Sequence, residues 1–97
     1  MTIDHIVLIE KKNDAMKEQM DAALKGIAGL KDKIPGILDV KIGNNFTDRT
    51  PNISHAAIIT MADKQALSGY GPHPAHEQVI KLLHQAASNW IVVDIET

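Results

Sequence analysis

A tyrosine and two histidines lie close together in the segment Tyr70-Gly-Pro-His73-Pro-Ala-His76. An imidazole has an unperturbed pKa of about 6.5, so a histidine can act as a base near neutral pH. A phenol, with an unperturbed pKa of about 10, donates a hydrogen bond to a developing enolate or alkoxide. We therefore interpret His76 as a candidate general base and Tyr70 as a candidate hydrogen-bond donor.

Two further histidines fall on apolar faces of predicted strands. His5 shares a strand face with Val7, and His55 shares one with Ala57, because alternate residues of a strand point the same way. We interpret these polar rings on apolar faces as the lining of a pocket between the sheet and its helices.

His76 lies on the apolar stripe of a predicted helix. It precedes Val79 and Ile80 by three and four residues, the spacing at which helical side chains are neighbours. The predicted pocket therefore takes side chains from strands and a helix. The residues that we expect to bind a substrate there are His5, Val7, His55, Ala57, His73, Val79 and Ile80.

Two other interpretations of these residues stay open. Part-buried histidines and tyrosines commonly bond to backbone carbonyls and only fill a core. Alternatively, His73 and His76 would hold a metal ion together with His5 or His55, although Pro74 places His73 at a helix cap. The sequence contains no dinucleotide or phosphate-binding glycine motif and no nucleophile elbow. We expect a site without cofactor or metal.

The composition indicates one ordinary globular domain, residues 1–97, because the chain is too short for two cores. Hydrophobic residues make up 44%, charged residues 23%, and the formal net charge is −2. Ten Lys and Arg residues and three aromatic residues supply neither a basic stripe nor a stacking platform. We therefore expect no nucleic acid partner.

The chain contains no cysteine, which excludes disulfides, thiolate metal ligands and a thiol nucleophile. The first residues carry no basic segment, and the apolar run at residues 6–9 is too short for a signal peptide or a membrane span. We expect a cytoplasmic location and no membrane partner.

Four segments have the β-branched composition and alternation of strands. They are residues 3–9, 37–42, 55–61 and 90–95. Apolar residues three and four apart predict a helix over residues 14–33. Asp63 is expected to cap a short helix, and Pro74 to begin a helix that runs to about residue 88. The polar composition of residues 44–54 predicts a mobile loop.

The order βαββαβ predicts an α+β, ferredoxin-like fold with both helices on one face of a four-stranded antiparallel sheet. The first strand is apolar on both faces, since Ile6 and Leu8 alternate with Val7 and Ile9. An uncovered apolar sheet face of several hundred Å² is rare on a monomer. We therefore expect a homodimer in which two sheets pack face to face as a dimeric α+β barrel.

These elements, together with the Tyr-x-x-His-Pro-x-His segment, resemble the stress-responsive A/B barrel (Dabb) family of dimeric α+β barrels. The matching segments are residues 5–8, 33–37, 43–45, 55, 70–76 and 92–96. The resemblance covers nearly the whole chain. It implies the ferredoxin-like fold, the dimer and an association with stress responses.

Plant polyketide (olivetolic acid) cyclases form one branch of that family. They close a linear poly-β-keto thioester by aldol condensation without cofactor or metal, using a Tyr and the last His of this motif. The resemblance therefore implies that Tyr70 and His76 form the chemical pair here. The plant enzymes have an aromatic first helix, whereas this chain has Met16, Met20 and Ala23 at such positions.

Three functions stay open on these grounds. The first is a cofactor-independent cyclase-like lyase that acts on a polyketide-like small molecule. The second is a stress-associated protein that binds a small molecule without catalysis. The third is a cofactor-free oxygenase.

Overall fold

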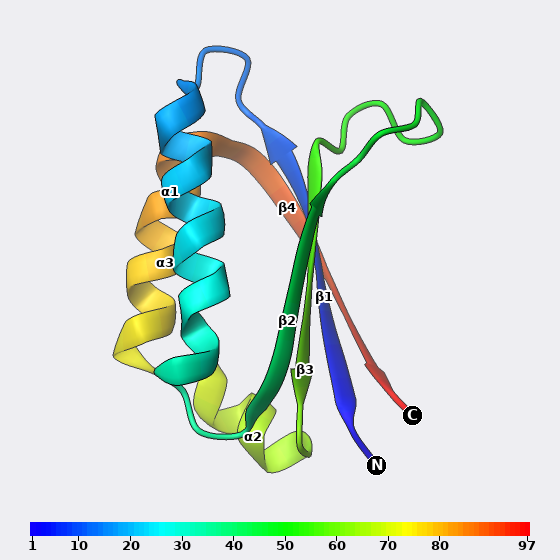
Figure 1. Cartoon of the computed structure of the whole chain (residues 1–97), viewed down its shortest axis with the longest axis vertical. Coiled ribbons are helices and arrows are strands. Elements are labelled where there is room, and N and C mark those ends of the chain that lie inside the picture. The colour runs from blue at the N-terminus through cyan, green and yellow to red at the C-terminus, as the bar shows by residue number, and fades with distance from the viewer.

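The computed structural model describes all 97 residues, and the chain forms the predicted βαββαβ order, including the predicted short helix after Asp63 (Figure 1). The elements are β1 (Ile3–Lys11), α1 (Lys17–Ala28), the 3-10 turn η1 (Gly29–Asp32), β2 (Ile37–Asn44), β3 (His55–Met61), α2 (Lys64–Tyr70), α3 (Pro74–Ala86) and β4 (Ala87–Glu96). Neither length nor hydropathy would let any of these helices act as a membrane-spanning segment.

The four strands form one antiparallel sheet in the order β2-β3-β1-β4. In Figure 1 the helices lie on one face of this sheet, and nothing covers the other face. The predicted fold class, an α+β ferredoxin-like fold with a four-stranded antiparallel sheet, is confirmed.

The first helix is shorter than the pattern over residues 14–33 predicts. Met16 is its N-cap, with an extended backbone, and its N–H donates to Gln19 Oε1 at 2.9 Å. Gly29 ends the α-helix, and the chain continues as the tighter turn η1. The last strand begins at Ala87, earlier than predicted, because Ala87 already pairs with Lys11 of β1.

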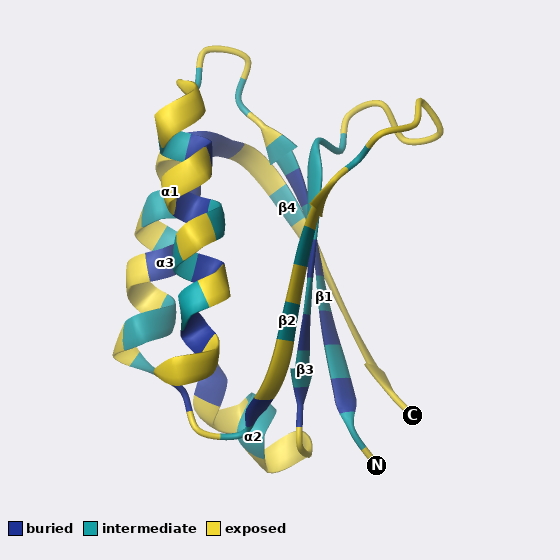
Figure 2. Cartoon of the chain, in the orientation of Figure 1, coloured by how far each residue is buried: buried dark blue, intermediate teal, exposed yellow.

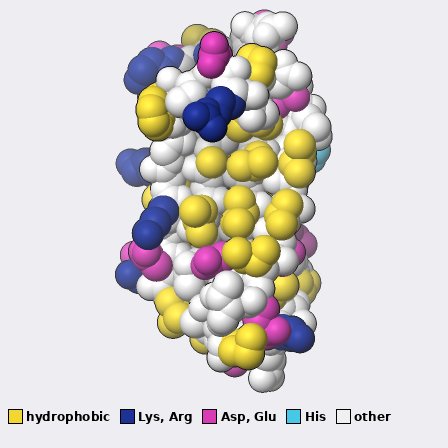
Figure 3. All heavy atoms as spheres, turned by 90° about the vertical axis from the view of Figure 1, so that its right-hand side faces the viewer, with side chains coloured by type: hydrophobic (Ala, Val, Ile, Leu, Met, Phe, Trp, Pro, Cys, Tyr) yellow, Lys and Arg dark blue, Asp and Glu magenta, His cyan; other side chains and the backbone are white.

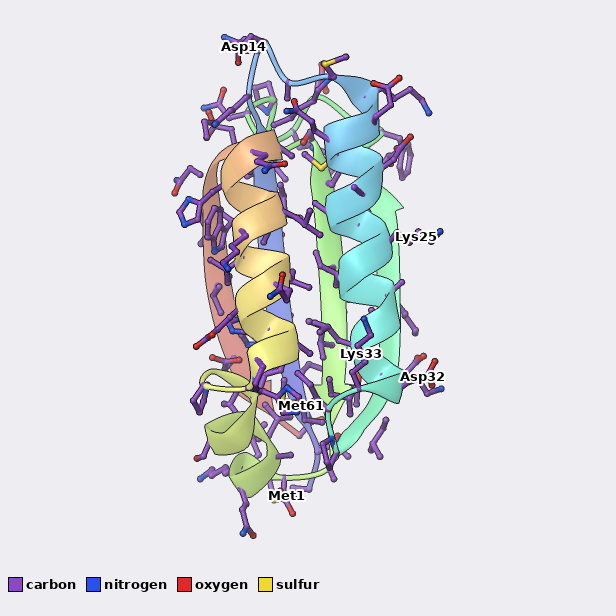
Figure 4. All side chains as sticks on the ribbon, turned by 90° about the vertical axis from the view of Figure 1, so that its left-hand side faces the viewer. Met1, Asp14, Lys25, Asp32, Lys33 and Met61 are labelled. Carbon is purple, nitrogen blue, oxygen red and sulfur yellow. The ribbon has the colours of Figure 1, made fainter.

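The core lies between the sheet and the helices, as the buried residues of Figure 2 show. Figure 4 shows α1 and α3 side by side across the sheet, with Lys25 on the side of α1 that faces away from α3. Gly26 permits this close approach: a Cβ at this position would lie 3.2 Å from Leu82 Cδ1. The two helices therefore form one layer over the sheet.

The other face of the sheet is apolar and uncovered, as the band of hydrophobic side chains in Figure 3 shows. Ile91, Val93 and Ile95 of β4 are each more than two-fifths exposed. This agrees with the prediction that strands apolar on both faces leave one face without a cover.

The loop predicted over residues 44–54 has internal hydrogen bonds, and Asn45 makes several of them. The Asn45 side-chain amide donates to the backbone oxygens of Thr50 and Ile53 at 3.1 and 2.8 Å. The Asn45 N–H also donates to Ser54 O at 2.9 Å. Asn45 thus links the beginning of the loop to its end.

Candidate functional site

Three of the predicted site residues, His5, Tyr70 and His76, meet between the sheet and the helices. The ring centroids of Tyr70 and His76 lie 4.4 Å apart, and those of Tyr70 and His5 lie 5.0 Å apart in an edge-to-face arrangement. His5 and Tyr70 are buried, and His76 is half-buried. The phenol therefore lies between two imidazoles.

Local sequence explains where Tyr70 and His76 lie. Tyr70 is the last residue of α2, and Gly71 caps that helix. Pro74 begins α3, since its fixed φ suits the first helical position. His76 thus falls in the first turn of α3, close to the end of α2.

The hydrogen bond of His76 assigns its tautomer. His76 Nδ1 lies 2.9 Å from the backbone oxygen of Gly71. A carbonyl oxygen only accepts, so Nδ1 carries the proton and donates. In the neutral ring, Nε2 then has a free lone pair, and it is this nitrogen that can accept a proton.

The sequence analysis missed Asp94, which bonds to His5. His5 Nδ1 lies 2.5 Å from Asp94 Oδ1, and the carboxylate accepts the Nδ1 proton. The two residues are direct partners in the β1–β4 register. Asp94 thus fixes the His5 ring and leaves its Nε2 without a proton in the neutral form. A possible signal was the alternation of β4, which puts Asp94 on the same face as Val92.

Burial raises the pKa of the Tyr70 hydroxyl to about 12, and the negative charge of Asp94 adds to the effect. Both causes disfavour the phenolate. The Tyr70 hydroxyl therefore stays protonated throughout the neutral range, in which it acts as a hydrogen-bond donor and not as a base.

The three rings border a small, partly open cavity of about 30 Å³, which is room for one water molecule. Six of the predicted residues line it: His5, Val7, Tyr70, His76, Val79 and Ile80. The lining residues that the sequence analysis missed are Ile27, Ile59, Leu83, Trp90 and Val92. The cavity is therefore mainly apolar, with the phenol and two imidazoles as its polar groups.

His55 and Ala57 do not line this cavity, although the first and third strands are neighbours as predicted. The register pairs His55 with Ile9 and not with His5, so His55 lies four residues farther along the sheet. His55 Nδ1 lies 2.8 Å from Ser54 Oγ. Burial, and next the charge of Lys11, lower the pKa of His55. Ala57 is fully buried in the core.

His73 also lies outside this cavity, because it caps a helix. Its Nδ1 accepts the N–H of Ala75 at 3.0 Å, at the start of α3. His73 lines a separate open groove of about 400 Å³, together with Gly36, Asp63 and Gly69. Asp63 caps α2 as predicted, accepting the N–H of Ala66.

The metal-binding alternative needs three ligands in one place. The chain brings together no group of three or more His, Asp or Glu side chains that could hold a metal ion. His73 and His76 are directed to different partners, the N–H of Ala75 and the oxygen of Gly71.

Solved structures show the same fold. A dimeric ferredoxin-like protein of unknown function from Jannaschia sp. is 24% identical, with a TM-score of 0.86 and 100% of both chains covered. A dimeric protein of unknown function from Bacteroides fragilis is 22% identical, with a TM-score of 0.78, covering 99% of this chain and 96% of that one. The hydroxynitrile lyase of Passiflora edulis is 19% identical, with a TM-score of 0.87, covering 97% of this chain and 91% of that one.

A comparison with curated proteins finds no match. The model of the family described as Stress responsive A/B Barrel Domain matches residues 3–97, nearly the whole length, and the ferredoxin-like sheet with its helices on one face agrees with it. The chain belongs to the stress-responsive A/B barrel (Dabb) domain family.

Proposed function

We propose that this protein catalyses a proton transfer of the aldol or retro-aldol type on a small carbonyl compound, without a cofactor, with His76 as base and Tyr70 as donor. The observation that carries the proposal is the pairing of a free His76 Nε2 with a phenol that stays neutral, on one cavity. The reaction needs a base with a lone pair and a donor that keeps its proton. The hydrogen bond to Gly71 leaves the lone pair of the neutral His76 ring on Nε2, and burial keeps the proton on Tyr70.

The steps follow from these two forms. His76 Nε2 takes the proton from the carbon next to the carbonyl, and the Tyr70 hydroxyl donates a hydrogen bond to the enolate oxygen that develops. The enolate carbon forms a bond to a second carbonyl carbon. The His76 imidazolium then returns the proton to the new alkoxide, so no proton is gained or lost overall.

Two further observations support the proposal. Asp94 accepts from His5 Nδ1 and so fixes the second imidazole beside the phenol. The Passiflora edulis protein of this fold is a hydroxynitrile lyase, so the fold accommodates a lyase. We infer that His5 helps to orient the carbonyl group.

The cavity limits the substrate. Its volume of about 30 Å³ is far below the several hundred Å³ of ordinary ligand pockets. A polyketide-like chain of the kind that the family resemblance implies would enter only after the lining side chains move. Even a compact carbonyl compound exceeds the room for one water molecule, so the lining side chains have to move for any substrate, and they move least for a small one.

The small cavity also favours a second candidate function, a stress-associated protein that does not catalyse a reaction. In that case the three rings are part of the core, with His5 Nδ1 bonded to Asp94 and His76 Nδ1 bonded to Gly71 O. No fully buried side-chain N or O atom lacks a partner. The two candidates differ in whether substrate protons exchange.

We also propose that the chain forms a homodimer through the open sheet face. The exposed aliphatic residues of β4 and the apolar band of Figure 3 support it, because a monomer rarely exposes such a patch. Two structures of this fold are dimeric proteins. Light scattering at micromolar concentration tests this, and a stable monomer would contradict it.

Deuterium exchange tests the proton transfer without knowledge of the product. Hydroxyacetone and cyclopentanone are incubated with the protein in D₂O, and loss of the α-proton signals is followed by proton NMR. We expect exchange above buffer for the wild type and for Gln85→Ala, a control at an exposed position of α3. His76→Ala and Tyr70→Phe should lose it. Buffer-level exchange by the wild type would favour the non-catalytic function.

A further inference from the structure

The open sheet face is arranged in rows of side chains that run across the strands. One central row contains Gly43, Ala56, Leu8 and Ile91, from β2, β3, β1 and β4 in that order. The next row contains Lys41, Ile58, Ile6 and Val93. Side-chain size therefore increases from the β2 edge to the β4 edge along the first row.

The surface is hollow at the small end of that row. A hollow of about 510 Å³ lies over Gly43 and Ala56, and Phe46 and Ile53 of the neighbouring loop form part of its wall. A Cβ at Gly43 would meet no atom within 4 Å. Phe46 is 94% exposed, although Asn45 holds its loop in place.

The opposite edge of the same face carries exposed apolar side chains. Ile91 is 48% exposed, and Val93 is 47% exposed. The face thus has an apolar hollow at one edge and apolar side chains without a cover at the other, at the same level along the strands.

We propose that the hollow over Gly43 is a socket for Ile91 of the partner subunit. The inference rests on the proposed homodimer and names its contacts. A two-fold axis parallel to the strands exchanges β2 with β4 and β3 with β1. It therefore sets Gly43 opposite the partner's Ile91, and Ala56 opposite the partner's Leu8, so that small residues face large ones. When two sheets pack within about 30° of each other, rows near the middle of the strands stay opposite each other.

The other way to stack the two faces is less favourable. A two-fold axis across the strands, between the two central rows, sets Ile91 against the partner's Val93 and Gly43 against the partner's Lys41. Large residues then meet at one edge, and a charged side chain faces the apolar hollow at the other. It also sets Asp4 against the partner's Glu10, and like charges that face each other repel. Both size and charge select the axis parallel to the strands.

Cross-linking tests the contact directly, because the natural chain has no cysteine. Gly43 and Ile91 lie on opposite edge strands, three strand spacings or about 14 Å apart, so cysteines there cannot bond within one chain. We expect the double variant Gly43→Cys/Ile91→Cys to form a covalent dimer under mild oxidation. Each single variant should stay without a cross-link.

A size swap provides a second and independent measurement. Gly43→Ile should weaken the dimer about tenfold or more, because the socket is filled within its own chain, while a β-branched residue suits the strand. Adding Ile91→Ala should restore much of the affinity. Gly69→Leu is the matched control, since a Cβ there also meets nothing and α2 lies off the open face. Sedimentation measures the dissociation constants.

The outcomes separate the socket from the dimer. A monomeric wild type would overturn both. A dimeric wild type with a cross-link for Ile91→Cys/Val93→Cys, and none for Gly43→Cys/Ile91→Cys, would overturn the socket alone and identify the other axis. A Gly43→Ile dimer as tight as the wild type would also overturn the socket.

Discussion

Asp94 and His5 are separated by 89 positions in the chain and lie 2.5 Å apart, carboxylate oxygen to Nδ1, across the two neighbouring strands β1 and β4. The pair places a negative charge close to Tyr70, where it opposes ionisation of the phenol. Asp94 therefore has two effects on the site: it orients the His5 ring and it helps to keep the Tyr70 hydroxyl protonated.

Titration of Tyr70 measures this effect. In the wild type we expect the phenolate to appear with a pKa of about 12. Asp94→Asn removes the negative charge, so the pKa should fall, but it should stay above the ordinary value of about 10 because burial, the larger cause, remains. Phenolate absorbance in the near ultraviolet reports on this residue alone, since the chain has a single tyrosine.

Asp32→Asn is the matched control for that titration, because Asp32 is exposed at the end of η1. Its removal should leave the Tyr70 curve unchanged. An identical curve for Asp94→Asn and the wild type would show that the Asp94 charge does not reach the phenol.

The same raised pKa predicts how stability depends on pH. The pKa of Tyr70 in the folded state, about 12, exceeds that of an unfolded tyrosine, about 10. The contribution to stability is therefore complete below about pH 10 and is lost as the pH rises through about 12. The free energy of unfolding should fall by roughly 2–3 kcal/mol over this range.

Tyr70→Phe isolates this contribution from the lysines that titrate in the same range. Urea unfolding of both proteins at about pH 9 and about pH 11 should show the wild type losing more stability than the variant. Equal losses would mean that the phenol ionises as easily in the folded chain as in the unfolded one.

Sequence patterns predicted the fold and the residues of the site that are close together in the chain. They failed for residues whose place in the site depends on how distant strands pair. Tyr70 and His76 are six residues apart, so a helix cap and a helix start bring them together. His55 was predicted at the pocket, but pairing with Ile9 moves it along the sheet. Asp94 was missed because its pairing with His5 depends on the register of strands at opposite ends of the chain, and a shift of one residue would place it on the other face.

His73 shows a second limit of the sequence analysis. A histidine at this position can line a pocket or cap a helix, and the sequence does not distinguish the two. The structure directs Nδ1 to the N–H of Ala75, so the ring caps α3. We expect His73→Ala to lower the free energy of unfolding by about 1 kcal/mol. His73→Asn keeps a capping acceptor and should stay close to the wild type.

Urea unfolding measures both His73 variants, and the α-proton exchange assay gives a second readout. Loss of the cap frays the turn that carries His76, so His73→Ala should lose some exchange activity while His73→Asn keeps it. Equal stability of the two variants would argue that the hydrogen bond to Ala75 contributes nothing.

Gly36 lies between η1 and β2 in a conformation that other residues rarely adopt, with φ at +92°. A Cβ there would also lie 2.5 Å from Ala66 Cβ on α2, the helix that ends at Tyr70. We therefore expect Gly36→Ala to destabilise the fold by about 1–3 kcal/mol and to displace α2.

Gly29→Ala is the control, because Gly29 has a helical φ and its added Cβ meets nothing within 4 Å. That variant should stay within about 1 kcal/mol of the wild type or gain stability. Thermal unfolding of both variants gives the comparison, and a Gly36→Ala protein as stable as Gly29→Ala would mean that α2 shifts away from the new methyl group at no measurable cost.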